Sequence, residues 1–406
     1  MVTPHQDAPE LLCPAIAVPD IVACDPGELD PLLAWLRADR PVDEATSFAR
    51  GSALPDGRLD LCKQSLGLAN AERLFGALAG NHQVRSLLLG TDGLRSAGAI
   101  ALASMLEDAR PPGLETLYLG CNHIELGGIE ALARAVTKVP LRALWLKRNP
   151  VGVEGARVLA TMLREQPALE VLDLTNTRLS DAGAEAIAEG LLGQVGLPRG
   201  LEVLMLGGNG IGERGAEALA EAIAQHPHLR ELGLAASQLG DAGAHALARG
   251  IARSRRLERL DLASNAIGVS GLGALLDALG GQSRLVALDL GSTPSSIALG
   301  ARDNELNDAI GGGLLGDWLA ADPSLGRIDL RHTGIRSRGA IAILAGLERN
   351  EHVFELQLGK FVARQVKRKI RARIESNRAR LPAASLATPW HVAAILSVYR
   401  SKLPGR

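Results

Sequence analysis

Hydrophobic and polar positions follow two different periods along most of the chain. In LYLGCNHIELGGIEALARAV, residues 117–136, leucines at positions 117 and 119 flank Tyr118, so that apolar side chains recur at every second residue. After Asn122 the apolar residues recur at every third or fourth residue, in the run GGIEALARAV. The first period is typical of a strand with one buried face and the second of an amphipathic helix. The stretch therefore predicts a short strand, a polar turn and a helix.

This stretch recurs about ten times, which predicts a solenoid. The template LxxLxLxxNxL is followed each time by a Gly- and Ala-rich helical run. A repeat of 20 to 50 residues indicates stacked copies of one strand-and-helix unit. The copies begin at Val84, Leu114, Leu141, Leu169, Leu201, Leu229, Leu257, Leu285, Leu325 and Val353, and a degenerate copy begins at Asp56.

The ninth position of the template is polar, and we expect it to be buried in the turn. A buried amide or hydroxyl can pair with backbone groups that an apolar residue would leave unsatisfied. The position holds Asn at 122, 149, 209 and 265, and Thr or Ser at 177, 237, 293 and 333.

The spacing of the two element types predicts a curved array. Strands pack about 4.8 Å apart, whereas helix axes need about 8–10 Å. An array with strands on one side and helices on the other therefore bends toward its strands. The expected shape is a horseshoe with the sheet on its concave face.

The template and the helical runs resemble leucine-rich repeats of the ribonuclease-inhibitor type. The runs GAIALA, GAEAIA, GAEALA and GAHALA also resemble the GALA subclass of bacterial proteins. The resemblance covers residues 56–360 and implies an α/β, right-handed leucine-rich-repeat solenoid, with a parallel β-sheet on the concave face and helices on the convex face. It does not define one function, because this scaffold serves inhibitors, receptors, GTPase activators and secreted effectors.

Three regions depart from the repeats and divide the chain. Residues 1–50 are predicted to be an N-terminal cap with a short helix near DPLLAWLRAD; a docking segment such as an F-box is the alternative. Residues 51–360 form the array, 361–381 a basic C-terminal capping helix, and 382–406 a linker with a last short helix, HVAAILSVYRSK. Terminal repeats of solenoids need such covers.

The unit that begins at Leu285 is longer than the others, with extra residues at about 292–303. Two interpretations stay open: a tolerated insertion, or a loop on the rim that folds over a ligand in the concavity. Ser292 and Arg302 are its candidate binding residues. The nearby acids Asp303, Glu305 and Asp308 do not match a calcium-loop pattern.

Residues 360–380 hold nine basic residues and one acid, a net charge of +8, so the rest of the chain carries −9. Val362, Val366, Ile370 and Ile374 form one apolar helical stripe. A helix that seals the last repeat is the first interpretation. A helix that also binds nucleic acid or an acidic membrane is the second.

The fifth template position should line the concave face. Along the array it reads Leu88, Tyr118, Trp145, Asp173, Met205, Gly233, Asp261, Asp289, Asp329 and Gln357. We expect Tyr118 and Trp145 to be exposed and to anchor a partner, because Trp and Tyr are enriched in interface hot spots. In the alternative they stack on each other and cover strand edges. Lys147 and Arg148 should make the first half positive, and the three aspartates at 261, 289 and 329 the second half acidic.

The chain shows no motif for chemistry. It has no P-loop, no GxSxG, no HExxH and no Cys/His set at metal spacing, so we expect no cofactor, no metal and no enzymatic activity. The cysteines at 13, 24, 62 and 121 form no pair pattern, which favours a reducing, cytoplasmic compartment. No secretory signal and no membrane span are predicted, although export as an effector stays possible.

The sequence therefore predicts a non-enzymatic scaffold that binds a partner protein or peptide on its concave face and rim. The alternatives are a host-directed bacterial effector or GTPase regulator acting in trans, and a nucleic-acid or membrane adaptor that uses residues 360–380. The predicted partner-binding residues are Leu88, Tyr118, Trp145, Lys147, Arg148, Asp173, Met205, Asp261, Asp289, Asp329, Ser292 and Arg302.

Overall fold

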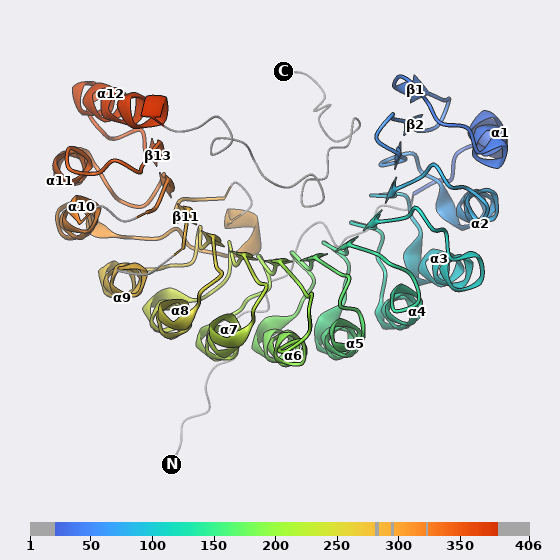
Figure 1. Cartoon of the computed structure of the whole chain (residues 1–406), viewed down its shortest axis with the longest axis horizontal. Coiled ribbons are helices and arrows are strands. Elements are labelled where there is room, and N and C mark those ends of the chain that lie inside the picture. Colours follow the sequence, from blue (N-terminus) through green and yellow to red (C-terminus); the bar gives the residue numbers. More distant parts are fainter. Residues whose placement is uncertain (1–20, 281–283, 294–295, 322–323, 381–406) are drawn as a thin grey trace, which may run out of the picture.

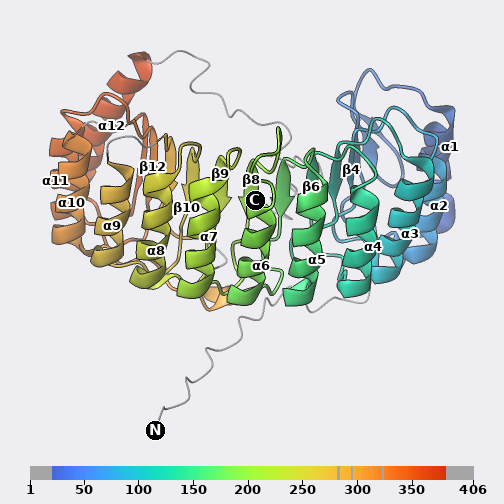
Figure 2. The ribbon, with the colours of Figure 1, turned by 60° about the horizontal axis from the view of Figure 1, so that its bottom comes forward.

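A computed structural model of the chain describes residues 21–280, 284–293, 296–321 and 324–380. These residues form an open, curved array in which strands line the inner side and helices the outer side (Figure 1). Seen from another direction, the helices stand side by side along the convex face (Figure 2). The predicted α/β horseshoe is therefore confirmed.

One sheet of 13 strands runs through the whole array in chain order. The strands from β3 to β13 pair in parallel, whereas β1, β2 and β3 pair antiparallel at the N-terminal edge, which the repeat pattern did not predict. The strands are β1 Thr46–Ser47, β2 Ser52–Ala53, β3 Arg58–Asp60, β4 Ser86–Leu88, β5 Thr116–Tyr118, β6 Ala143–Trp145, β7 Val171–Asp173, β8 Val203–Met205, β9 Glu231–Gly233, β10 Arg259–Asp261, β11 Ala287–Asp289, β12 Arg327–Leu330 and β13 Glu355–Leu358.

A helix follows almost every strand and returns the chain to the start of the next one. Among the described residues, no helix is long and apolar enough to cross a membrane. The α-helices are α1 Asp30–Ala38, α2 Gly67–Leu78, α3 Arg95–Ala109, α4 Leu126–Val136, α5 Gly152–Glu165, α6 Ser180–Leu192, α7 Glu213–Gln225, α8 Gly240–Arg253, α9 Val269–Leu279, α10 Gly312–Ala320, α11 Ser337–Leu347 and α12 Arg364–Arg380. Short helical turns are η2 Pro26–Leu29, η3 Ile297–Leu299 and η4 Asn307–Gly311.

The core lies between the sheet and the helices and is continuous along the array. Leu117 and Leu119 are fully buried on the helix side of the sheet, as the template requires. The small residues of the helical runs allow neighbouring helices to touch. A Cβ added to Gly250 in α8 would lie 2.3 Å from the carbonyl oxygen of Ala220 in α7, so no side chain fits there.

Where the polar ninth position is Asn, its side chain ties the repeat to the one before it. The buried Ser237 hydroxyl, in contrast, has no hydrogen-bond partner among the described residues. The Asn149 Nδ2 donates to the carbonyl oxygens of Leu119, at 3.0 Å, and Leu146, at 2.8 Å. Its Oδ1 accepts from the backbone N–H groups of Asn122, at 3.1 Å, and Ile124, at 3.0 Å. The prediction of a buried amide that pairs with the turn is therefore correct.

In the long repeat a different residue takes this role. Counting from Leu285 had put Thr293 at the ninth position, but Asn304 makes the equivalent hydrogen bonds. Its Nδ2 donates to the carbonyl oxygens of Leu262 and Leu290, at 2.9 and 2.8 Å. The extra residues therefore lie between Ser292 and Asn304, close to the predicted bounds.

Both ends of the array are covered by elements outside the repeat pattern. At the N-terminal end, α1 packs against α2 and buries Leu29, Leu32, Leu33 and Leu36. At the C-terminal end, α12 packs against α11 and buries Val362 and Ile370. Cys13 and the whole of segment 382–406, with the predicted last helix, lie outside the described residues.

Candidate functional site

Tyr118 and Trp145 lie side by side on the concave face, but they are not exposed. Only 2% of Tyr118 and 7% of Trp145 is accessible to solvent. Their ring centroids lie 6.4 Å apart at an interplanar angle of 52°. The expectation of an exposed aromatic pair was therefore wrong, and the alternative, in which the two rings pack on each other, fits this geometry.

Two glycines and a lysine account for the burial of Tyr118. A Cβ added to Gly90 would lie 2.3 Å from Tyr118 Cε1, and one added to Gly120 would lie 2.7 Å from Tyr118 Oη. The ring therefore lies flat over positions that have no side chain. The Lys147 Nζ sits 5.8 Å from the Tyr118 centroid, 5.9 Å from the Trp145 centroid and 3.9 Å from Asp173 Oδ2. The lysine charge is thus directed at neighbours within the fold.

The other predicted residues of this half are also less available than expected. Leu88 and Asp173 are buried, and Lys147, Arg148 and Met205 are partly buried. An exposed aromatic binding surface in the first half was therefore a wrong expectation, whereas binding by the partly accessible Lys147 and Arg148 stays a prediction. Alternation in a strand defines which way a side chain points, but its neighbours decide whether solvent reaches it.

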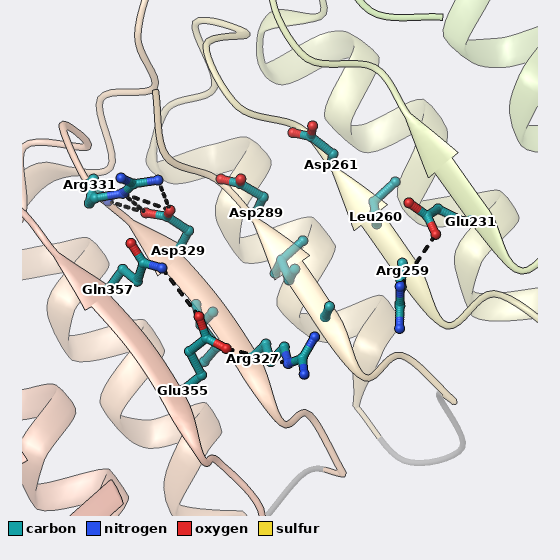
Figure 3. Close-up of a pocket in the computed structure, with 13 residues that line it drawn as sticks. Glu231, Arg259, Leu260, Asp261, Asp289, Arg327, Asp329, Arg331, Glu355 and Gln357 are labelled. Carbon is teal, nitrogen blue, oxygen red and sulfur yellow. Dashed lines mark hydrogen bonds and ion pairs between the residues drawn. The ribbon is translucent and has the colours of Figure 1, made fainter. Parts of the chain in front are cut away.

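The second half of the concave face holds an open groove across β9 to β13. It has a volume of about 330 Å³. Figure 3 shows Asp261, Asp289 and Asp329 on three neighbouring strands, at matched positions of the paired sheet. The predicted acidic end is present, with all three carboxylates partly accessible.

The groove is more mixed in charge than the sequence predicted. Besides the three aspartates it contains Glu231, Glu355, Arg259, Arg327 and Arg331. Most of these are the third residue of their templates, which also points to the concave face because it lies two residues before the fifth. This period-two signal is present in the sequence, but the prediction of the concave face considered only the fifth position.

Each arginine of the groove is already paired with a carboxylate. Arg259 lies 3.6 Å from Glu231, Arg327 lies 3.4 Å from Glu355, and Arg331 lies 2.5 Å from Asp329 (Figure 3). These three pairs leave two of the five groove carboxylates, Asp261 and Asp289, outside the ion pairs of the described groove residues, although the Arg331 charge also acts on Asp289. The groove therefore has an unbalanced negative charge at its centre.

Burial and like charge affect the pKa values of these two carboxyls. Burial raises the pKa of Asp261 to about 7, and the nearby charges of Asp289, Glu231 and Asp329 add to this rise. The Ala263 backbone N–H, which donates to Asp261 Oδ1 at 3.0 Å, opposes it. Burial also raises the pKa of Asp289, and Asp329 adds to this effect. A cation placed between them would restore both charged forms.

The rim residues of the long repeat lie beside this surface. Ser292 is partly buried, and Arg302 is exposed and accepts a backbone hydrogen bond from Ala266 at 2.9 Å. Among the described residues, no group of three or more His, Cys, Asp or Glu side chains is arranged to hold a metal ion. What the groove offers is paired and unpaired charge on a rigid sheet, which suits recognition of a polar ligand.

The fold and this groove define an open α/β solenoid with a charged groove on its concave sheet. The family described as Leucine Rich repeat matches residues 113–133, 167–188, 200–220, 225–248 and 253–276. The chain is a leucine-rich repeat protein of the ribonuclease-inhibitor-like class.

Individual relatives are similar over part of the chain. Ribonuclease inhibitor of Sus scrofa is 32% identical over 211 residues, which cover 51% of this chain and 42% of that protein. Ribonuclease inhibitor of Mus musculus is 32% identical over 112 residues, or 27% of this chain and 24% of that protein. The chain thus spans less than half the length of these curated relatives. Among solved structures, leucine-rich repeat-containing protein LegL7 from Legionella pneumophila aligns over 78% of this chain and 96% of its own, with 19% identity and a TM-score of 0.47.

Proposed function

We propose that this protein is a non-enzymatic scaffold that binds a partner protein through the concave groove across β9 to β13. Asp261 and Asp289 receive a basic side chain of the partner. The observation that carries the proposal is the pair of carboxylates that belong to no ion pair in a groove whose other described charges are matched one to one. A ligand that supplies the missing positive charge gains affinity and specificity from it.

The rigidity of the sheet supports this function. The groove residues sit on five consecutive strands joined in one sheet, so little conformational freedom is lost when a partner binds. Ribonuclease inhibitor is named for its action on another protein, and its repeats are of the same class as those of this chain.

The proposal can be tested with fluorescein-labelled peptides of graded net charge. We expect basic peptides to bind and acidic peptides not to bind, and we expect the double variant Asp261→Asn/Asp289→Asn to lose about tenfold or more in affinity. The measurement is fluorescence anisotropy at low salt, where surface charge is least screened.

Asp277→Asn is the matched control, because Asp277 is an exposed carboxylate on α9, away from the concave face. Its peptide affinity should stay at the wild-type value. Equal binding of acidic and basic peptides, or full retention of affinity by the double variant, would contradict the proposal.

The other expectations stay predictions. They include membership of the GALA subclass, a cytoplasmic location, and a role as an effector or GTPase regulator. Binding of nucleic acid or membrane through residues 360–380 also stays a prediction. The apolar stripe of α12 is used in packing, so such binding would rely on its outward-facing charges.

A further inference from the structure

The extra residues of the long repeat build one wall of a small cavity beside the groove. Leu299, in the turn η3, is 97% buried, and it packs with Ala236 and Ala301. A Cβ added to Gly208 would lie 3.2 Å from Leu299 Cδ1. The loop that follows β11 therefore bends back to the repeats of β8 and β9.

Several hydrogen bonds hold the described part of this loop in place. The backbone N–H of Ala301 donates to the Ser296 carbonyl oxygen at 2.9 Å, and the N–H of Ala266 donates to the Arg302 carbonyl oxygen. The Ser264 hydroxyl donates to Asp303 Oδ1 at 3.1 Å. The wall is thus a fixed part of the concave rim.

The cavity has a volume of about 130 Å³ and mostly apolar walls. Met205, Ala235 and Leu299 line it together with the glycine of β9 and two glycines of the turn that follows β8. Since a water molecule occupies about 30 Å³ of liquid, this space suits a chain of four or five heavy atoms. It is too small for an aromatic ring with its polar substituents.

Two polar side chains in the cavity point to the chemistry of an occupant. Asn176 is 96% buried, and its Oδ1 has no hydrogen-bond partner among the described residues, although a buried amide normally has one. The second is Asp261, which lines both this cavity and the groove and has no cation opposite it. Asn176 and Asp261 belong to repeats three strands apart, so they lie at different ends of the cavity. An occupant with a positive charge at the Asp261 end and a polar donor at the Asn176 end would satisfy both groups.

We propose that this cavity is a specificity pocket for a lysine side chain of the partner, whose ammonium pairs with Asp261. The four methylenes pack on Met205, Ala235 and Leu299. Arginine fits less well, because its planar guanidinium is larger and needs several acceptors in one plane. The pocket rests on the proposed function, since it selects among the basic ligands that the groove attracts.

The test compares four fluorescein-labelled peptides that share a Gly/Ser backbone and differ at two central positions. These positions hold lysine, arginine, acetyl-lysine or norleucine. We expect the lysine peptide to bind roughly tenfold more tightly than the arginine peptide, and the two uncharged peptides to bind more weakly than both. The measurement is anisotropy at about pH 8, where the Asp261 carboxyl is ionised.

Ala235→Leu fills the cavity from the concave face and should abolish the preference for lysine over arginine while leaving arginine binding within about twofold. Gly359→Leu is the control, because it changes the same template position in the last repeat, outside the cavity. Leu299→Ala removes the loop wall and should lessen the preference even if Ala235→Leu does not fold.

The outcomes separate the two proposals. If neither basic peptide binds the wild-type protein, the groove function itself fails. If both bind equally, or if Ala235→Leu and Leu299→Ala keep the lysine preference, the pocket is wrong while the groove function stands.

Discussion

At the scale of single residues, the buried amides of the ninth position carry much of the connection between repeats. Asn149 makes four hydrogen bonds to backbone groups of its own repeat and the preceding one. Removing one partner of a buried hydrogen bond costs about 1–3 kcal/mol, because the other partner stays unsatisfied. The template predicted this role correctly, because the need to pair a buried turn is local.

Asn149→Ala should therefore lower the free energy of unfolding by about 3 kcal/mol, measured by urea denaturation. Asn149→Thr should cost less, since Thr177 occupies the same position and donates its hydroxyl to the Leu174 carbonyl oxygen. Arg157→Ala, on the exposed side of α5, is the control and should change stability by less than about 0.5 kcal/mol. If Asn149→Ala lost as little stability as the control, the claim that the ninth-position amides connect the repeats would be contradicted.

At the scale of elements, some polar side chains of the basic helix α12 bind the last repeat, whereas others are exposed to solvent. The Arg373 guanidinium donates to the carbonyl oxygens of Leu347 and Asn350, at 2.9 and 2.8 Å. The Asn377 Nδ2 donates to the carbonyl oxygens of Asn350 and Val353, at 3.1 and 2.9 Å. Arg368 and Arg371, in contrast, are exposed. The sequence identified the apolar stripe of this helix but not which cations cover the end of the last repeat.

The double variant Arg373→Ala/Asn377→Ala should expose the end of the array and destabilise it by about 2–4 kcal/mol, since it leaves buried carbonyl groups without donors. Hydrogen exchange should show the loss first in α11 and β13, because repeats contact mainly their neighbours. Arg368→Ala/Arg371→Ala removes two positive charges from the outward face, one more than the first variant, and should leave exchange unchanged. Equal protection in the two double variants would argue against a capping role.

At the scale of the whole molecule, stacking repeats in register places like charges of distant segments together. Asp261 and Asp289 are 28 positions apart in the chain but occupy paired positions of neighbouring strands. Their repulsion and burial exist only in the folded state. The native protein therefore holds a proton on Asp261 up to about pH 7, whereas the unfolded chain releases it near the ordinary value of 3.8.

The contribution of Asp261 to stability should accordingly fall as pH rises from about 4 to about 7, because its native carboxyl stays protonated over this range while the unfolded one ionises. Burial lowers the pKa of His226 to about 4, which acts in the opposite direction, so the contribution of Asp261 is taken from the difference between wild type and variant. Asp261→Asn removes the charge and keeps an acceptor for the Ala263 N–H. It should raise the free energy of unfolding on the order of 1–2 kcal/mol at about pH 8 and have little effect near pH 4. Urea denaturation of both proteins across this pH range measures the difference. A difference that did not change with pH would contradict the burial of an ionisable carboxyl here.

The sequence by itself determined the repeat, the order of strand, turn and helix, the curved α/β architecture and the acidic end of the concave face. These follow from local periodicity and from the different widths of strands and helices, which act in the same way in every repeat. Only the tertiary structure decided accessibility: Gly90 and Gly120 let Tyr118 lie flat and buried, and the loop that carries Leu299 reaches back over earlier repeats to enclose a cavity. Such outcomes depend on which side chains meet across repeats. The alternation in the sequence predicts the face on which a side chain lies, but it does not predict which residues pack beside it.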